Sequence, residues 1–329
     1  MTDPAPDIAR LTATAAEASA GRTSGLRLLD DTGLLAVVLD VTGLATDERQ
    51  PLEDRVRAAL LNEAGVREVR VAMTAEKKTL TIIAVGSGKG GVGKSTLAAN
   101  LAVALRRLGV KVGLVDADIH GPSLPRLMDS EDAKPASRGS KLVPVDNAYG
   151  VPMLSTGQIA APGQAIAWRG PMAGRALEQL IDASWGAVDT LVVDLPPGTG
   201  DVQLTMIQKH KPAGAVIVST PQDLALMDAA RAVSLFEQVE VPIIGLVENM
   251  AGYVCPHCGG VSDPFGSGGA ETAAKEMGLD FLGRVPLAMG IRLASDGGVP
   301  PAAGTDPQGE PFHAIAARVA AWLEARKGR

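Results

Sequence analysis

The segment from Leu80 to Thr96 limits the possible folds of this chain more than any other part of its sequence. The apolar run Leu80-Thr-Ile-Ile-Ala-Val85 is followed by Gly86-Ser-Gly-Lys-Gly-Gly-Val-Gly-Lys-Ser-Thr96 and then by leucines at helical spacing. A strand, a turn of the pattern G-x-x-x-x-G-K-S/T and a helix, in this order, are typical of a phosphate-binding loop, or P-loop. The sequence therefore predicts a nucleotide site. The alternative, a glycine-rich turn that binds nothing, is disfavoured because motif and context agree.

The residue types of this turn indicate how it would hold ATP. Glycines allow the backbone to curl so that its N–H groups face the phosphates, and the N-terminus of the following helix adds a favourable dipole. Lys94 supplies positive charge to the β- and γ-phosphates, and the Ser95 hydroxyl is a ligand for Mg²⁺. We expect the nucleotide to be bound by Gly88, Lys89, Gly90, Gly91, Val92, Gly93, Lys94, Ser95 and Thr96.

Three aspartates follow predicted strands and are assigned to the same site. Asp116 and Asp118 end the run Val112-Gly-Leu-Val-Asp-Ala-Asp118, and Asp194 ends Leu191-Val-Val-Asp194. A single aspartate at a strand end is usually a cap or turn residue. Three of them beside a P-loop, at the carboxyl edge of a parallel sheet, indicate ligands for Mg²⁺ and water.

From Leu80 onward, apolar strands alternate with helices, which is the pattern of a mostly parallel, doubly wound α/β sheet. We expect a P-loop domain over residues 77–329 that contains the cysteine pair. Strands are predicted at 80–85, 111–115, 190–194, 213–219 and 242–247. The polar, turn-rich stretch 130–149 indicates an excursion with a hairpin.

A small α+β domain is predicted to precede the P-loop domain, over residues 25–76. Its pattern is strand, helix, strand, at 34–41, 51–63 and 69–73. Residues 1–24 are rich in Ala, Thr, Ser and Asp and have weak periodicity, so we expect a mobile or loosely helical tail there.

Composition excludes several classes of protein. The chain has 329 residues, of which 46% are apolar and 21% charged, and its net charge is −6. These values allow a sizeable core and disfavour non-specific nucleic-acid binding, which needs clustered Lys and Arg. The start lacks the basic and apolar regions of a secretory signal, and no apolar stretch approaches about 18 residues. We therefore expect a cytoplasmic protein with neither a nucleic-acid nor a membrane partner.

The only two cysteines, Cys255 and Cys258, form a C-x-x-C pair flanked by Tyr253-Val and Gly259-Gly. Two thiolates on one side of a turn suit a soft metal. A 4Fe–4S cluster needs about four ligands, which two chains meeting at a two-fold axis would supply. A Zn²⁺ ion held by the same four sulfurs and a redox dithiol are the competing interpretations.

Several longer segments resemble one family. Lys89-Gly-Gly-Val-Gly-Lys94, with its extra early lysine, is similar to the deviant Walker A motif of the MinD/ParA/nitrogenase-reductase class. Within that class the chain resembles the Mrp/ApbC group of iron–sulfur cluster carriers. The matching segments are Asp116-Ala-Asp-Ile-His-Gly-Pro-Ser123, Trp168-Arg-Gly-Pro171, Asp194-Leu-Pro-Pro-Gly-Thr-Gly-Asp201, Thr220-Pro-Gln-Asp223, Glu248-Asn-Met250 and Cys255-Pro-His-Cys258.

The resemblance implies a role for each residue near the nucleotide. Lys89, Lys94 and Asp118 would act in catalysis. Lys89 would reach across a dimer to the partner's nucleotide; the alternative is that it only adds positive potential within its own loop. Asp118 would position the attacking water. Asn249 would contact the adenine. The Mg²⁺ shell would contain Ser95, Asp116 and Asp194.

The function implied by the resemblance is an ATP-dependent iron–sulfur cluster carrier that hydrolyses ATP slowly. Two chains would hold a 4Fe–4S cluster between them through Cys255 and Cys258 and pass it to apo-proteins, in contact with other cluster-assembly proteins. Residues 34–74 resemble only the second half of the family's N-terminal domain, so that domain is expected to be truncated.

The alternative function is a spatial-organising ATPase of the MinD/ParA kind, acting on a membrane or DNA surface. The amphipathic stretch 311–329 ends in basic residues and would suit a membrane-seeking helix. A terminal helix packed on the sheet is the preferred interpretation of that stretch.

Overall fold

The structure is a computed structural model and describes residues 7–29, 33–44, 46–75, 79–119, 121–139, 141–159 and 171–327. The chain divides into two compact units: unit 1 is residues 1–78 and unit 2 is residues 79–329. Most of the family-like segment Trp168-Arg-Gly-Pro171 lies outside the described residues.

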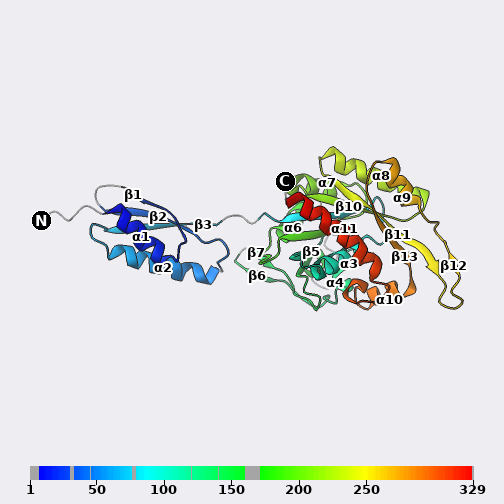
Figure 1. The fold of residues 1–329 in the computed structure, drawn as a ribbon, viewed down its shortest axis with the longest axis horizontal. Helices are drawn as coiled ribbons and strands as arrows, with labels where there is room; N and C mark the ends of the chain where they lie inside the picture. The colour runs from blue at the N-terminus through cyan, green and yellow to red at the C-terminus, as the bar shows by residue number, and fades with distance from the viewer. Residues whose placement is uncertain are drawn as a thin grey trace. The chain divides into compact units, whose positions relative to one another are not determined.

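Unit 1 combines a three-stranded sheet with two helices (Figure 1). Its elements are α1 (Ile8–Ala18), β1 (Thr23–Leu28), β2 (Leu34–Asp40), α2 (Thr46–Leu61) and β3 (Glu68–Thr74). The central strand β2 is antiparallel to β1 and parallel to β3. Leu35, Val37 and Leu39 of β2 alternate with less buried residues and pack with side chains from both helices. The expected strand, helix and strand are present, with a further helix and strand before them.

Within residues 1–24, where we expected a mobile or loosely helical tail, the structure has helix α1 over residues 8–18 and the start of β1 at residues 23–24. Leu11 and Ala15 lie one helical turn apart, are 1% and 0% exposed, and pack into the core of unit 1. Asp7 caps the helix, because its carboxylate accepts a hydrogen bond from the Ala9 N–H at 2.9 Å. The apolar stripe is hard to recognise in the sequence because alanine contributes most of it.

Unit 2 contains an eight-stranded sheet (Figure 1). Its strands are β4 (Thr81–Gly86), β5 (Val112–Asp116), β8 (Met153–Ser155), β9 (Thr190–Asp194), β10 (Gly214–Ser219), β11 (Ile243–Val254), β12 (Val261–Ser262) and β13 (Phe281–Leu287). The order is β12-β11-β10-β4-β9-β5-β8, and β13 pairs with β11. Only the pairing of β11 with β12 is antiparallel among these strands. The prediction of a mostly parallel α/β sheet is confirmed.

Helices cover both faces of this sheet. They are α3 (Lys94–Arg107), α4 (Leu124–Leu127), α5 (Thr156–Ile159), α6 (Pro171–Ile181), α7 (Asp201–His210), α8 (Asp223–Gln238), α9 (Gly269–Glu276), α10 (Met289–Asp296) and α11 (Glu310–Lys327), with a 3-10 turn at Pro301–Ala303. Successive residues of β4 point to opposite faces. Ile83 and Val85 join the core formed with α3 and α11, whereas Ile82 and Ala84 join the core formed with α6, α7 and α8.

The strand order brings the predicted site residues to one edge. In the parallel register Val85 of β4 lies beside Asp194 of β9, and Asp194 lies beside Asp116 of β5. The turn that follows β4 therefore meets both strand-end aspartates, although 100 residues of sequence separate Lys94 from Asp194.

Two hairpins project from this framework. The polar excursion contains β6 (Ala136–Arg138) paired antiparallel with β7 (Lys141–Val143), as expected. The strand predicted at 242–247 is longer than expected, because β11 continues to Val254. Its last residues pair with β12, with Tyr253 opposite Ser262. The cysteine pair lies between β11 and β12.

The C-terminal helix α11 packs on the sheet. Phe312 and Ile315 are each 1% exposed and Val319 is 0% exposed, all within the core that contains α3. The apolar stripe of this helix is thus already buried. None of the described helices is both long and apolar enough to cross a bilayer.

The packing of α1 makes a direct prediction. Leu11→Ala should lower the free energy of unfolding of unit 1 by about 2–4 kcal/mol, because it opens a cavity in a small core. Ile8→Ala on the same helix is the control, since Ile8 is 53% exposed and should change stability little. Both would be measured by chemical denaturation followed by proteolytic mapping. Equal stability of the two variants would restore the mobile-tail interpretation.

Candidate nucleotide site and cysteine hairpin

The P-loop is shaped by close contacts with its neighbours as well as by its sequence. A Cβ on Gly88 would lie 2.0 Å from the backbone oxygen of Asp228 in α8, so only glycine fits there. Gly91 and Gly93 adopt left-handed φ values of 80° and 81°. Such a backbone turns successive N–H groups toward a common point, which is the geometry of an anion-binding nest.

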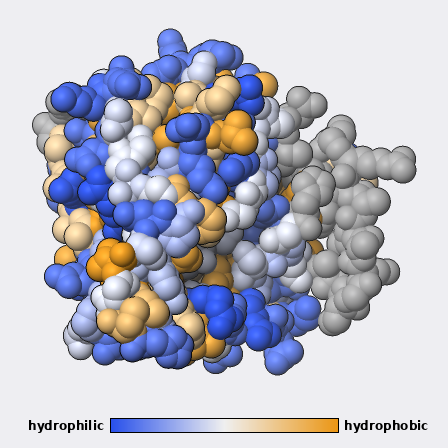
Figure 2. Space-filling model, turned by 90° about the vertical axis from the view of Figure 1, so that its right-hand side faces the viewer, coloured by the Kyte–Doolittle hydropathy of each residue, from blue (hydrophilic) through white to orange (hydrophobic). Residues whose placement is uncertain are grey.

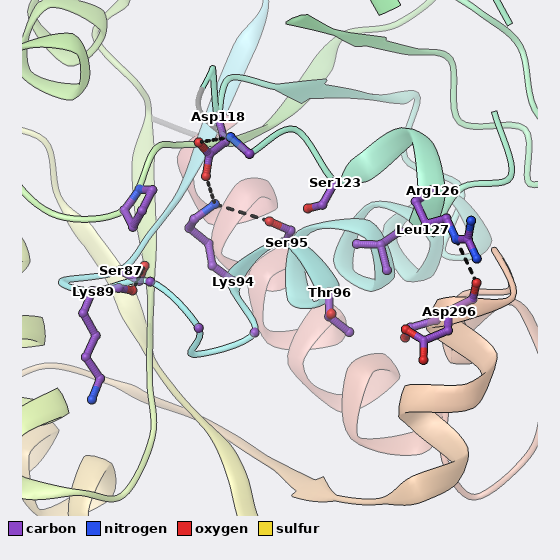
Figure 3. A pocket seen from close by; sticks show the side chains of 16 residues that line it. Ser87, Lys89, Lys94, Ser95, Thr96, Asp118, Ser123, Arg126, Leu127 and Asp296 are labelled. Carbon is purple, nitrogen blue, oxygen red and sulfur yellow. Dashed lines mark hydrogen bonds and ion pairs between the residues drawn. The ribbon is translucent and has the colours of Figure 1, made fainter. Parts of the chain in front are cut away.

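Lys94, the first residue of α3, is the buried positive centre of the site. Its side chain is 6% exposed, and its ammonium lies 2.6 Å from Asp194 Oδ1 and 3.9 Å from Asp118 Oδ2. It also donates a hydrogen bond to Ser95 Oγ at 3.4 Å. Figure 3 shows the ammonium directed toward Asp118 and Ser95. The structure therefore brings together residues from separate segments of the chain that the sequence analysis assigned to one site.

Asp194 retains one unused oxygen at the centre of this cluster. The residue is 0% exposed, and among the described residues its Oδ2 has no hydrogen-bond partner. Burial raises the pKa of this carboxyl, and the Lys94 ammonium partly opposes that shift. A buried carboxylate oxygen without a donor is costly. It therefore marks a position where a cation or a water molecule would be stabilised.

Asp116, which we expected in the Mg²⁺ shell, accepts hydrogen bonds from three protein groups. Its Oδ1 accepts a hydrogen bond from the Asp118 N–H at 3.2 Å. Its Oδ2 accepts from the Leu124 N–H at 3.0 Å and from Ser155 Oγ at 3.1 Å. These bonds fix the chain that carries Asp118 and the start of α4. Burial, followed by the nearby Asp194 charge, raises the pKa of Asp116 to about 7.

Asp118 lies where its carboxylate would contact a ligand bound in the cavity. It is 9% exposed and lines the cavity beside the P-loop. Its Oδ1 accepts from the Gly121 N–H at 3.2 Å, and its backbone oxygen accepts from Thr156 Oγ1 at 3.5 Å. A backbone N–H of its own loop thus holds the Asp118 side chain at the wall of the cavity.

The cavity has a volume of about 400 Å³ and extends beyond the predicted residues. Its far wall comes from α4 and α10 and is drawn in Figure 3. The lining residues that were not among the predicted site residues are Ser87, Gly121, Ser123, Arg126, Leu127, Pro197, Ser295 and Asp296. Arg126 Nε donates to the Asp296 backbone oxygen at 3.0 Å and so joins the two helices. The α4 side of the cavity was indicated by the segment Asp116-Ala-Asp-Ile-His-Gly-Pro-Ser123. No sequence motif indicates the α10 side.

The side chains of Lys89 and Asn249 differ in what they contact. Lys89 lines the cavity, forms no ion pair with the described residues, and in Figure 3 extends away from Lys94. The Asn249 side chain, on β11, instead forms a hydrogen bond within the protein: its Nδ2 donates to the Val92 backbone oxygen at 2.8 Å. The structure thus shows Asn249 in contact with the P-loop itself.

The cysteine pair forms the tip of the β11–β12 hairpin. The Cys255 N–H donates to the Gly260 oxygen and the Gly259 N–H donates to the Cys255 oxygen, both at 2.9 Å. Both thiols are free, and Cys258 is exposed. The backbone N–H groups of His257 and Cys258 lower the pKa of the Cys255 thiol by stabilising its thiolate. In the part of the chain that the structure describes, no three His, Cys, Asp or Glu side chains form a metal-binding group.

Apolar side chains flank the two thiols. Val254 and Val261, which pair across the hairpin, are 60% and 74% exposed. Figure 2 shows the side on which β12 lies in Figure 1, where separate hydrophobic patches interrupt a hydrophilic surface. A free C-x-x-C pair framed by apolar residues is suited to contact with another protein surface.

The raised pKa of Asp116 predicts a pH dependence of stability. A carboxyl whose pKa is near 3.8 when unfolded and about 7 when folded binds protons more tightly in the folded state. The nucleotide-free protein should therefore lose stability as pH rises from about 4 to 7, by at most about 1.4 kcal/mol per pH unit for this group. Denaturant unfolding at several pH values measures the slope. Asp116→Asn should flatten it, whereas Asp146→Asn, at an exposed position, should not. A slope of the opposite sign would refute this assignment.

Comparison with known proteins gives the family of the chain. Residues 78–320 match the ParA family model described as NUBPL iron-transfer P-loop NTPase. The iron–sulfur cluster transfer protein NUBPL of Dictyostelium discoideum is 49% identical over 240 residues, which are 72% of this chain and 74% of that protein. The iron–sulfur cluster carrier protein of Deinococcus radiodurans is 43% identical over 275 residues, covering 80% of this chain and 78% of that one.

Solved structures agree with this fold. A nucleotide-binding protein from Archaeoglobus fulgidus, in complex with ADP, is 40% identical and superposes with a TM-score of 0.61 over 71% of this chain and 91% of that chain. The cell division ATPase MinD of Pyrococcus furiosus, at 22% identity and a TM-score of 0.57, covers 74% of this chain and 99% of that chain and shows the fold alone. The resemblance stated from the sequence is confirmed. The chain belongs to the ParA family of NUBPL-type iron-transfer P-loop NTPases.

Proposed function

We propose that this protein is an ATP-dependent carrier that receives an iron–sulfur cluster as cargo and transfers it to apo-proteins. The observation that carries the proposal is the presence, in one folded unit, of a P-loop with a buried lysine and an exposed hairpin with two free thiols. The names of the relatives at 41–49% identity support the same function. The ADP complex of the Archaeoglobus protein supports a nucleotide as the ligand of the P-loop.

The first step is capture of the triphosphate by Lys94 and the loop N–H groups. In the free protein the Lys94 ammonium is held by Asp194 and Asp118, so its charge is already desolvated and oriented. The β- and γ-phosphate oxygens compete for this ammonium when ATP binds. A preoriented charge in a buried site binds phosphate more tightly than a flexible surface lysine does.

The residues around Lys94 fit Mg²⁺ as a partner of the nucleotide. The unused Oδ2 of Asp194 and the Ser95 hydroxyl are hard oxygen ligands of the type that Mg²⁺ prefers. When bound there, Mg²⁺ would neutralise negative charge on the phosphates. Asp116, whose oxygens accept three protein hydrogen bonds, holds the Asp118 loop beside that position.

Hydrolysis would use Asp118 to orient the attacking water, because this carboxylate lines the cavity and is held by the Gly121 N–H. Lys89 would complete the site of a second chain in a homodimer, since its ammonium forms no ion pair with the described residues and extends away from its own Lys94. Turnover that requires such a partner is expected to be slow in the isolated chain. The activity proposed is thus that of a slow ATP hydrolase.

The thiols of Cys255 and Cys258 would bind the cluster. The lowered pKa of Cys255 favours the thiolate that binds iron. One chain has two cysteines, so a 4Fe–4S cluster of about four thiolate ligands requires a second copy. Nucleotide binding at both P-loops would alter the contact between the two copies and thereby the exposure of the cluster.

The MinD-like surface-binding alternative finds no support in the described helices. The stripe of α11 that would face a membrane is buried against the sheet, and the Pyrococcus furiosus MinD structure resembles this chain at only 22% identity. The carrier function is therefore the single function proposed.

Lys94→Ala tests the nucleotide site. ATP affinity should fall by roughly two orders of magnitude, since a hydrogen bond to a charged group contributes about 1.5–3 kcal/mol. Lys209→Ala is the matched control, because Lys209 forms an ion pair with Glu178 at the surface, where such pairs contribute little. Titration calorimetry with thermal unfolding of each variant gives both affinity and folding. Unchanged ATP affinity in folded Lys94→Ala would overturn the site assignment.

Cys255→Ser tests the cargo site. Anaerobic reconstitution with iron and sulfide should give a brown chromophore in the native chain and none in Cys255→Ser, while ATP affinity stays unchanged. Lys94→Ala serves as the reciprocal control and should keep the chromophore. A chromophore of full intensity in Cys255→Ser would exclude the shared cluster. If the native chain stays colourless and instead binds Zn²⁺ through its cysteines, the cysteine pair is a zinc site and the iron–sulfur proposal is wrong.

A further inference from the structure

The side chain of Asn249 fixes one peptide group of the P-loop. Its Nδ2 donates to the Val92 backbone oxygen at 2.8 Å. A trans peptide is planar, with its C=O and N–H pointing in opposite directions. Holding the Val92 oxygen therefore aims the Gly93 N–H the other way, and that N–H donates to none of the described groups. An N–H held in this orientation is ready to donate to phosphate.

The contact between Asn249 and the loop is too tight to be incidental. A Cβ placed on Gly93 would lie 2.0 Å from Asn249 Nδ2. Gly93 also has a left-handed φ of 81°, which other residues adopt at a cost. The glycine of the P-loop pattern is therefore required at this position by Asn249 as well as by the turn.

The strand that carries Asn249 is anchored at the residue that precedes it. Glu248 is 0% exposed and accepts hydrogen bonds from the Gly268 N–H at 3.0 Å, the Ala270 N–H at 2.8 Å and Arg284 Nε at 3.0 Å. Met250 has a left-handed φ of 59°, which is uncommon for a residue with a side chain. A rigid support next to a strained residue is the arrangement expected where a side chain must be held in one position.

We propose that Asn249 is a positioning residue for phosphate, which orients the Val92–Gly93 peptide of the P-loop independently of the nucleotide base. The inference rests on the proposed binding of nucleotide and specifies how the loop is kept competent for it. It differs from the adenine contact implied by the family resemblance. A base contact acts only on ligands that have a base, whereas a loop-positioning contact acts on every ligand with a phosphate chain.

Inorganic tripolyphosphate distinguishes these roles, because it presents the phosphates of ATP without sugar or base. Its affinity and that of ATP would be measured in Mg²⁺ buffer by titration calorimetry on the full chain. Asn249→Ala removes the donor to Val92. Asn249→Leu keeps a similar side-chain shape without the donor and serves if the alanine variant does not fold. Asn147→Ala is the matched control, because Asn147 Nδ2 also donates to a backbone oxygen, that of Val151 at 2.6 Å, in a turn outside the site.

We expect both Asn249 variants to bind tripolyphosphate and ATP about ten-fold more weakly, as for loss of one charge-assisted hydrogen bond, with the ratio of the two affinities unchanged. Asn147→Ala should bind both as the native chain does. Loss of ATP affinity with unchanged tripolyphosphate affinity would assign Asn249 to the base and overturn the proposal. Unchanged affinity for both ligands would also overturn it. If the native chain binds neither ligand, the proposed nucleotide function itself fails, which separates that failure from this one.

Discussion

The contact between the Lys94 ammonium and the Asp194 carboxylate is the interaction on which the rest of the site depends. The two groups lie 2.6 Å apart and are 6% and 0% exposed, so water screens them little. The contact is possible because β4 lies next to β9 and β9 next to β5, so that Lys94, Asp116 and Asp194 converge from three parts of the chain. Asp116 is satisfied by hydrogen bonds and fixes the neighbouring loop, whereas Asp194 retains an unused oxygen. The Lys94 ammonium is therefore held at the edge of the sheet when no ligand is bound, in a position where phosphate would contact it.

Strand β11 links the two chemical parts of unit 2. Glu248 anchors it in the sheet, and Asn249 contacts the P-loop. A few residues later the strand ends at Val254, directly before Cys255 and the turn of the hairpin. The same strand therefore contacts the P-loop at one position and leads to the two thiols at its end. A change in the P-loop that moves Asn249 has a short covalent path to the cysteines.

Much of the fold and part of the site could be predicted from the sequence. The strands β4, β5, β9 and β10 are almost entirely buried, so each is a largely apolar run that is easy to recognise. The P-loop residues follow from a fixed motif. The packed state of helix α1 was not predicted because its buried stripe is largely alanine, and the second half of β11 was not predicted because it is mixed in polarity. The hydrogen bond from Asn249 to Val92 joins residues 157 positions apart, and no local pattern reports such a contact.

The proposed function requires two copies of this chain to share one iron–sulfur cluster. It is tested most directly by measuring iron, acid-labile sulfide and native mass on protein isolated without oxygen. A shared cluster predicts a dimer with about four iron and four sulfide per two chains. A monomer that carries a full cluster, or a dimer without iron and sulfide, would contradict it.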